Sequence, residues 1–85
     1  MMSKELTLKI LTPEGTAFCG AADAVHVPGT AGRFEILPDH ASIISSLVAG
    51  ELRWRHAGKE RSYAVRSGAI MLKDNEISVC AEPAE

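Results

Sequence analysis

The chain has 85 residues, a formal net charge of −2 and 24% charged residues, and these values exclude several classes of protein. A chain this short buries only about 60–65% of the surface that its unfolded form exposes, so we expect residues 1–85 to form a single domain without a cleft between lobes. The Lys and Arg residues are dispersed and outnumbered by acids, which gives no electrostatic footprint for nucleic acid. A hydrophobic content of 46% indicates a globular domain rather than a disordered segment.

Signals for membrane insertion, secretion and disulfide bonding are weak in this sequence. No apolar run approaches the roughly 20 residues that span a bilayer, and residues 1–5 lack the apolar core of a signal peptide, so we expect a cytoplasmic protein. The two cysteines, Cys19 and Cys80, are too few for a disulfide scaffold and lack C-x-x-C spacing. We expect small buried thiols in strands, and the sequence leaves a disulfide between them open.

Short runs of alternating apolar and polar residues recur from one end of the chain to the other. The predicted strands are residues 6–10, 16–22, 25–27, 34–36, 52–55, 63–65, 70–72 and 77–79. Turns or breaks are predicted between them at residues 12–15, 28–29, 38–40, 56–59, 67–68 and 73–76. Turn signals about every 8–12 residues are typical of a sandwich or barrel, so the predicted fold class is all-β.

The segment from residue 41 to residue 48 is ambiguous, because its apolar residues fit a helical face as well as a strand. It starts after Pro38 and ends at Gly50, which leaves little more than two helical turns. Ile43 and Ile44 are β-branched and favour a strand. We predict a strand, with room for a single helical turn at its start.

The stretch from Val25 to Ala41 contains the strongest turn signals in the sequence. Pro28 and Gly29 predict a sharp turn, and Gly32 permits a second bend. The intervening loop carries Thr30, Ala31 and Arg33, with no cluster of acids or bases able to perform chemistry. A rigid loop without catalytic groups is better suited to binding a partner, and we predict a docking surface at residues 28–33.

The histidines are the strongest candidates for metal binding or acid–base catalysis. His26 is predicted on the outward face of a strand, His40 in the corner after Pro38, and His56 in a turn, so no spacing brings them together as ligands. Asp39 beside His40 suggests an acid–base pair, but neighbours on an extended chain point to opposite sides, which favours a turn cap. We predict no catalytic residues, no metal site and no cofactor.

Four short blocks follow one another along the chain at characteristic intervals. They are Leu11-Thr12-Pro13-Glu14 with Phe18-Cys19-Gly20, the V-P-G-x-x-G-x-F-x-I-L-P-x-H-A block from Val27 to Ala41, Gly50-Glu51-Leu52-Arg53, and Ala64-Val65 with Gly68. In this combination the chain closely resembles the epsilon subunit of the rotary F-type ATP synthase over nearly its whole length.

The resemblance implies a β-sandwich of two sheets with about five strands each. It also implies a non-catalytic rotor subunit of the central stalk that binds the gamma subunit and the c-ring and couples ion-driven rotation to ATP synthesis. Such a subunit is peripheral to the membrane, on the cytoplasmic face of the bacterial inner membrane. By position, the loop from Pro28 to Arg33 would meet the c-ring, and Asp39 and His40 would lie near the gamma and c-ring contact.

The chain departs from the family pattern at several points. Many members carry a carboxylate at the position of Arg33, and Asp39 and Ser42 replace the usual glycine and proline. Typical bacterial members continue into an inhibitory C-terminal helical hairpin, which we expect to be lacking because the sequence ends at Glu85. Two alternatives remain open: a free-standing β-sandwich interaction module, and a small-molecule or metal-binding domain that uses His26, Asp39 and His40.

Overall fold

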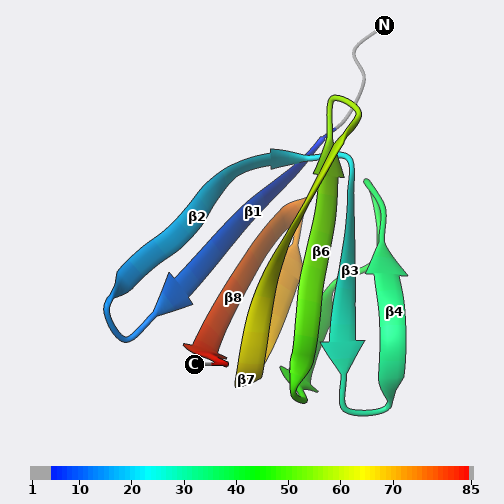
Figure 1. The fold of residues 1–85 in the computed structure, drawn as a ribbon. Coiled ribbons are helices and arrows are strands. Elements are labelled where there is room, and N and C mark those ends of the chain that lie inside the picture. Colours follow the sequence, from blue (N-terminus) through cyan, green and yellow to red (C-terminus); the bar gives the residue numbers. More distant parts are fainter. Residues whose placement is uncertain (1–4, 85) are drawn as a thin grey trace, which may run out of the picture.

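The computed structural model describes residues 5–84, which form eight β-strands and no helix (Figure 1). The strands are β1 (Leu6–Thr12), β2 (Gly15–Ala22), β3 (Ala24–Gly29), β4 (Gly32–Ile36), β5 (Ile43–Leu47), β6 (Gly50–His56), β7 (Lys59–Lys73) and β8 (Glu76–Pro83). The predicted all-β class is confirmed. Among the described residues no helix is long and apolar enough to cross a membrane. Residues 1–4, on which the expected absence of a signal peptide partly rests, and residue 85 lie outside this range.

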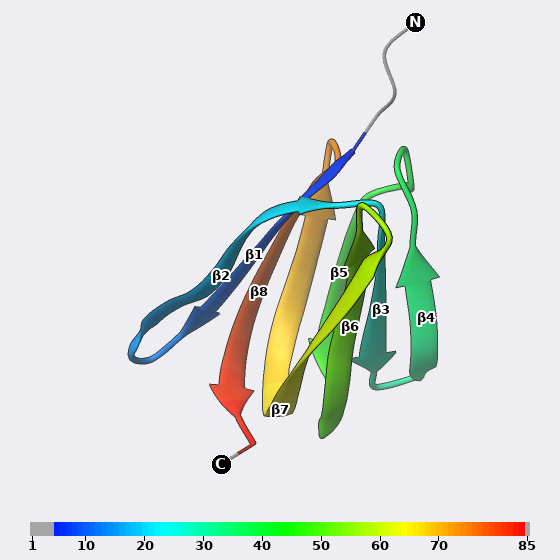
Figure 2. The same cartoon turned by 45° about the horizontal axis from the view of Figure 1, so that its top comes forward.

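The strands form one connected sheet that folds over into the layers of a sandwich (Figures 1 and 2). The order is β2-β1-β8-β7-β5-β3-β4, and β6 closes a circuit because it pairs with both β3 and β7. The β1–β8 pair is parallel and the remaining pairs are antiparallel. The expected sandwich is therefore confirmed, but the two separate five-stranded sheets are a single eight-stranded sheet in which strands are shared between layers.

The long strand β7 is the element shared by the two layers. A break was predicted at Ser67 and Gly68, but β7 continues through both residues. Its first half pairs with β6 up to Val65, and its second half pairs with β5 and β8. The register shifts between Val65 and Ser67, which is the signature of a β-bulge. This bulge explains why the sequence pattern suggests a break. The extra residue moves the core-facing positions of β7 from odd-numbered residues, such as Val65, to even-numbered ones, such as Ile70 and Leu72.

Gly68 lies opposite Ala81, where the backbones of β7 and β8 approach each other closely. A Cβ atom at this position would collide with the carbonyl oxygen of Cys80 and would lie 3.1 Å from the Cα atom of Ala81. Only glycine allows the two backbones to approach this closely. The bulge and Gly68 together let β7 change layers without losing its hydrogen-bonded partners.

The core confirms the predicted alternation on β1, β6, β8 and the second half of β7. It is one cluster of aliphatic side chains from both layers with Trp54 at its margin, where the indole packs on Phe18 with ring centroids 4.7 Å apart. The fully buried larger side chains are Leu6, Leu8, Ile10, Val25, Val27, Ile36, Leu52, Val65, Ile70, Leu72, Ile77 and Val79. Burying a side chain of this size contributes about 1.5–3 kcal/mol, so this cluster is the main favourable term in folding.

The ambiguous segment is a strand, as predicted, without a helical turn at its start. Residues 43–47 form β5, whose five residues pair in register with β7 from Leu72 to Gly68. Pairing with a central strand satisfies the backbone of β5, and this non-local interaction decides between two patterns that the local sequence allows.

The turns predicted at residues 56–59 and 73–76 are both two-residue hairpin turns. The central residues of both turns, Ala57 with Gly58 and Asp74 with Asn75, have positive φ values between 51° and 79°. Two-residue turns of this kind match the twist of the flanking strands, and Asn and Gly tolerate them best. These turns fix the register of β6 on β7 and of β7 on β8.

The prediction of buried thiols was wrong. Cys19 in β2 and Cys80 in β8 are both exposed and free. Cys80 lies between buried Val79 and Ala81 and so points to the opposite face. Strand parity, rather than the usual burial of cysteine, determines the exposure of these side chains.

We predict that Gly68→Ala destabilises the fold by about 1–3 kcal/mol, because the added methyl group meets backbone rather than a flexible side chain. Urea denaturation followed by circular dichroism measures the change. The matched control is Ala69→Ser at the neighbouring exposed position, where the expected change is within about 0.5 kcal/mol. Equal stability of the two variants would contradict the close approach of β7 and β8.

Candidate docking surfaces

The predicted docking loop is a tight hairpin between β3 and β4. Pro28 and Gly29 do not form a turn; they are buried residues of β3. The turn consists of Thr30 and Ala31, and only residues 30–33 of the predicted loop are exposed. The surface available to a partner at this end of the molecule is therefore shorter than the sequence suggested.

Hydrogen bonds to the neighbouring chain hold this hairpin in place. The backbone N–H and the hydroxyl of Thr30 both donate to the carbonyl oxygen of Ser46, each at 3.1 Å. The backbone N–H of Val48 donates to the carbonyl oxygen of Pro28 at 2.9 Å. Because the tip is bonded to β5 and to the segment that follows it, the hairpin cannot swing without breaking these bonds.

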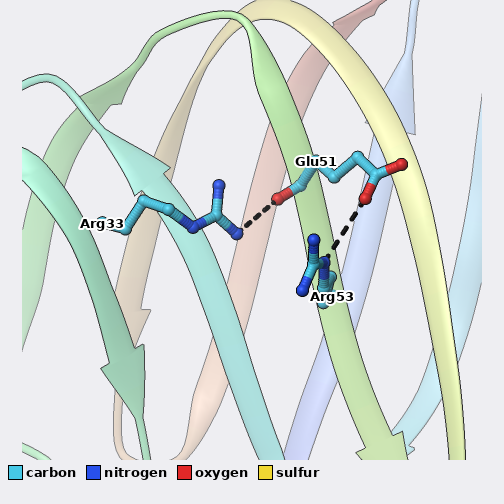
Figure 3. Close-up of polar contacts among 3 residues, drawn as sticks. All are labelled: Arg33, Glu51 and Arg53. Atoms are coloured by element: carbon cyan, nitrogen blue, oxygen red, sulfur yellow. Dashed lines mark hydrogen bonds and ion pairs between the residues drawn. The ribbon is translucent and has the colours of Figure 1, made fainter.

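The side chain of Arg33 on β4 reaches across strand β3 to the backbone of β6. Its guanidinium donates to the carbonyl oxygen of Glu51 at 2.9 Å, and the carboxylate of Glu51 lies 3.3 Å from Nε of Arg53 (Figure 3). All three side chains remain exposed. The positive charge of Arg33 is thus held at a defined position beside the hairpin tip.

Asp39 and His40 lie at the other end of the molecule. Strand β4 runs from the hairpin tip toward these residues, so the structure separates them from residues 30–33 (Figures 1 and 2). The predicted turn is present: the N–H of His40 donates to the carbonyl oxygen of Leu37 at 3.1 Å, and Asp39 has a φ of 69°. The imidazole Nδ1 of His40 lies 2.8 Å from the carbonyl oxygen of Ala41. The predicted site residues therefore form two separate surfaces rather than one.

The turn at Asp39 is held against the β7–β8 hairpin. The N–H of Asp39 donates to the side-chain oxygen of Asn75 at 2.6 Å, and the side-chain nitrogen of Asn75 donates to the Asp39 carboxylate at 3.2 Å. An open polar cavity of about 460 Å³ lies between the two loops and is lined by residues 39–42, 74 and 75. Loops 36 residues apart in sequence are thus joined into one surface.

Exposed apolar side chains lie beside this second surface. Ile44, which is 84% exposed, is the cross-strand neighbour of half-exposed Met71 on the outer face of β5 and β7. Both strands continue directly toward the loops that contain Asp39 and Asn75. An apolar pair beside a polar rim is typical of a protein interface rather than of a solvated sheet face.

The three histidines have different partners. The imidazole of His26 lies 3.2 Å from the carboxylate of Glu35, and that of His56 lies 3.7 Å from Asp23. Glu5 joins the latter pair, so three exposed ligand atoms lie within 4.8 Å of one another. No residue spacing predicts this group, because it combines the residue just before β1, the β2–β3 corner and the end of β6. These exposed groups do not by themselves identify a metal site.

We predict that Asn75→Gly loosens the second surface, because glycine keeps the positive φ but removes both hydrogen bonds to Asp39. Hydrogen exchange at the Asp39 amide should accelerate, and unfolding free energy should fall by about 0.5–1.5 kcal/mol for each lost bond. Asp74→Gly, at the other positive-φ position of the same turn, is the control and should leave that amide protected. Similar exchange in both variants would argue against the Asn75 contact.

Comparisons with known proteins agree with this fold. The family model described as "ATP synthase, Delta/Epsilon chain, beta-sandwich domain" matches residues 5–85. The ATP synthase epsilon chain of Desulfitobacterium hafniense is 36% identical over 84 residues, which cover 99% of this chain and 64% of that one. The epsilon chain of Desulforamulus reducens is 39% identical with the same coverage, and that of a Synechococcus strain is 38% identical over 94% of this chain and 59% of its own. The chain thus spans less than two thirds of the length of these relatives.

Two solved structures share the fold at low sequence identity. A chain of the Euglena gracilis mitochondrial ATP synthase, determined with its OSCP, F1 and c-ring, superposes with a TM-score of 0.86 at 17% identity and covers 98% of this chain and 56% of that one. A chain of the Tetrahymena thermophila mitochondrial ATP synthase central stalk and c-ring gives a TM-score of 0.76 at 11% identity, covering 96% and 66%. On the match to residues 5–85 and these relatives, the chain belongs to the family of ATP synthase delta/epsilon chain β-sandwich domains.

Proposed function

We propose that residues 1–85 act as one non-catalytic domain in the central stalk of an F-type ATP synthase, where they bind the gamma subunit and the c-ring. Membership of the delta/epsilon family supports this assignment. The observation that carries it is the hydrogen-bonded hairpin tip at residues 30–33, which is exposed yet held to β5 and β6. A rotor component must transmit torque through its contacts, and a surface that does not bend is suited to this task.

The two separated surfaces suggest two partners. The hairpin tip with Arg33 is proposed to meet the polar loops of the c-ring. The opposite surface, formed by the Asp39 turn with Ile44 and Met71, is proposed to meet the gamma subunit, since it combines apolar contact area with a polar rim. Contacts at both ends of one sheet would couple the partners through β4, β5 and β7 without any moving part.

The same assignment implies a location and an energy source. The domain would be peripheral, on the cytoplasmic face of the bacterial inner membrane, and would reach the membrane only through its partners. Ion flow through the c-ring, carried by protons or sodium ions, would drive its rotation. Its role in ATP synthesis would be mechanical, through the position of the hairpin tip and the stiffness of the sandwich.

We predict that Arg33→Glu weakens attachment to the c-ring while changing the unfolding free energy by no more than about 1 kcal/mol, because the residue is exposed and loses one hydrogen bond to Glu51. The assay is recovery of gamma and c subunits with the tagged chain from solubilised membranes of its host. Arg55→Glu, an exposed charge reversal on β6, is the matched control.

Wild-type chain should recover both partners, Arg33→Glu should recover less c subunit, and Arg55→Glu should behave as wild type. Equal recovery with both variants would contradict the placement of the hairpin tip. Recovery of neither partner by the wild-type chain would overturn the stalk assignment and favour a free-standing interaction module.

A further inference from the structure

A second cavity, of about 370 Å³, lies at the open side of the sandwich between β2 and the β6–β7 hairpin. Its lining includes Phe18 and Ala21 from β2, Trp54 and His56 from β6, and Lys59 and Arg61 from β7. A volume of this size is within the range of small-molecule sites in proteins. None of these residues belongs to the two docking surfaces, so this cavity is a separate feature of the fold.

The floor of the cavity is aromatic. The rings of Phe18 and Trp54 are 4.7 Å apart and tilted by 44°, a geometry that leaves apolar ring surface on either side of the contact. Trp54 is only 4% exposed, whereas Phe18 is half-buried. An apolar ligand portion would bury the remaining exposed surface of Phe18.

The indole of Trp54 also carries an unused hydrogen-bond donor. Its Nε1 atom is buried and has no partner among the described residues. Leaving a buried donor unpaired is costly, and such groups in native proteins call for an explanation. Because the atom itself is buried, a ligand in the cavity does not reach it, and recognition there depends on the ring surface and the cationic rim.

Cationic side chains occupy core-facing positions at the rim. Arg61 is the cross-strand partner of Trp54, and Lys59 is the partner of His56, so all four side chains share the inward face of β6 and β7. The Arg61 guanidinium lies 5.1 Å from the centre of the Phe18 ring. Within residues 5–84 neither Lys59 nor Arg61 takes part in an ion pair. Two cations without an ion-pair partner among these residues therefore border the aromatic floor, while His56 at the same rim is paired with Asp23.

We propose that this cavity binds a small carboxylate with an apolar body. The carboxylate would lie between Lys59 and Arg61, and the apolar portion would cover Phe18 and Trp54. Charge complementarity favours a single anionic group at one end of the ligand, and the cavity volume favours a ligand the size of a medium-chain acid over a folded partner. This site goes beyond the proposed stalk function and does not depend on it.

Tryptophan fluorescence can detect binding at this site, because Trp54 is the single tryptophan of the chain. Titration of the full chain with decanoate, below the concentration at which it forms micelles, should change Trp54 emission in a saturable way. Decanol, which has the same chain length without the charge, should bind several-fold more weakly. Arg61→Gln should weaken decanoate binding roughly fivefold, as expected for one exposed charge pair. Arg53→Gln, on the opposite face of β6, is the matched control and should leave binding unchanged.

Several outcomes would overturn the proposal. These are an emission change that does not saturate, equal responses to decanoate and decanol, or equal weakening by Arg61→Gln and Arg53→Gln. Much tighter binding of a short acetylated peptide with adjacent leucine and glutamate would assign the cavity to a protein segment instead. Since the titration needs no partner subunit, its failure would leave the stalk assignment untouched.

Discussion

The fold depends on one strand that bonds to both layers. Strand β7 pairs with β6 along its first half and with β5 and β8 along its second, and the bulge between Val65 and Ser67 lets it turn from one layer to the other. Gly68 allows the backbone of β8 to pass close to this point. A sandwich whose layers are joined by a continuous hydrogen-bonded strand resists sliding of one layer over the other, which two sheets joined only by side-chain packing would not do as well.

This continuity connects the two proposed docking surfaces. The hairpin tip with Arg33 is bonded to β5 and β6, and the Asp39 turn is bonded to the β7–β8 hairpin. Each surface is therefore attached to a strand that pairs with β7. A load applied at one surface reaches the other through backbone hydrogen bonds, which is the mechanical property that a stalk component needs. The cavity at the open side of the sandwich lies outside this path and has an independent function in our account.

Much of the fold follows from local sequence, because alternation and turn chemistry act over a few residues. The inward faces of the strands, the turn at Asp74 and Asn75, and the fold class were all predictable. The turn predicted at Pro28 and Gly29 was wrong: proline and glycine usually mark turns, but here both residues belong to β3. Here Gly29 is needed because the ring of Phe34 packs where a Cβ atom would lie. Likewise, a β-bulge and a break between two strands both shift the alternation of apolar and polar residues by one position, so the sequence alone does not distinguish them.

What could not be predicted depends on contacts between distant segments. The Asp39–Asn75 bonds, the crossing of Arg33 to Glu51 and the separation of the two surfaces all follow from strand order. Local patterning does not predict the cationic rim of the cavity, because Lys59 and Arg61 are exposed although they share the inward face of the β6–β7 hairpin with Trp54. Local patterns describe each strand well but do not describe where the sandwich opens.

The most direct test of the account is a cross-link from the hairpin tip inside the assembled complex. Ala31→Cys, placed in a chain whose exposed Cys19 and Cys80 are replaced by serine, would carry a short photoactivated cross-linker at the tip. A hairpin tip that faces the c-ring should give a product with the c subunit, and Ala57→Cys at the other end of the molecule should give none. A product with c from Ala57→Cys, or none from Ala31→Cys in complexes that contain the chain, would contradict the proposed orientation in the stalk.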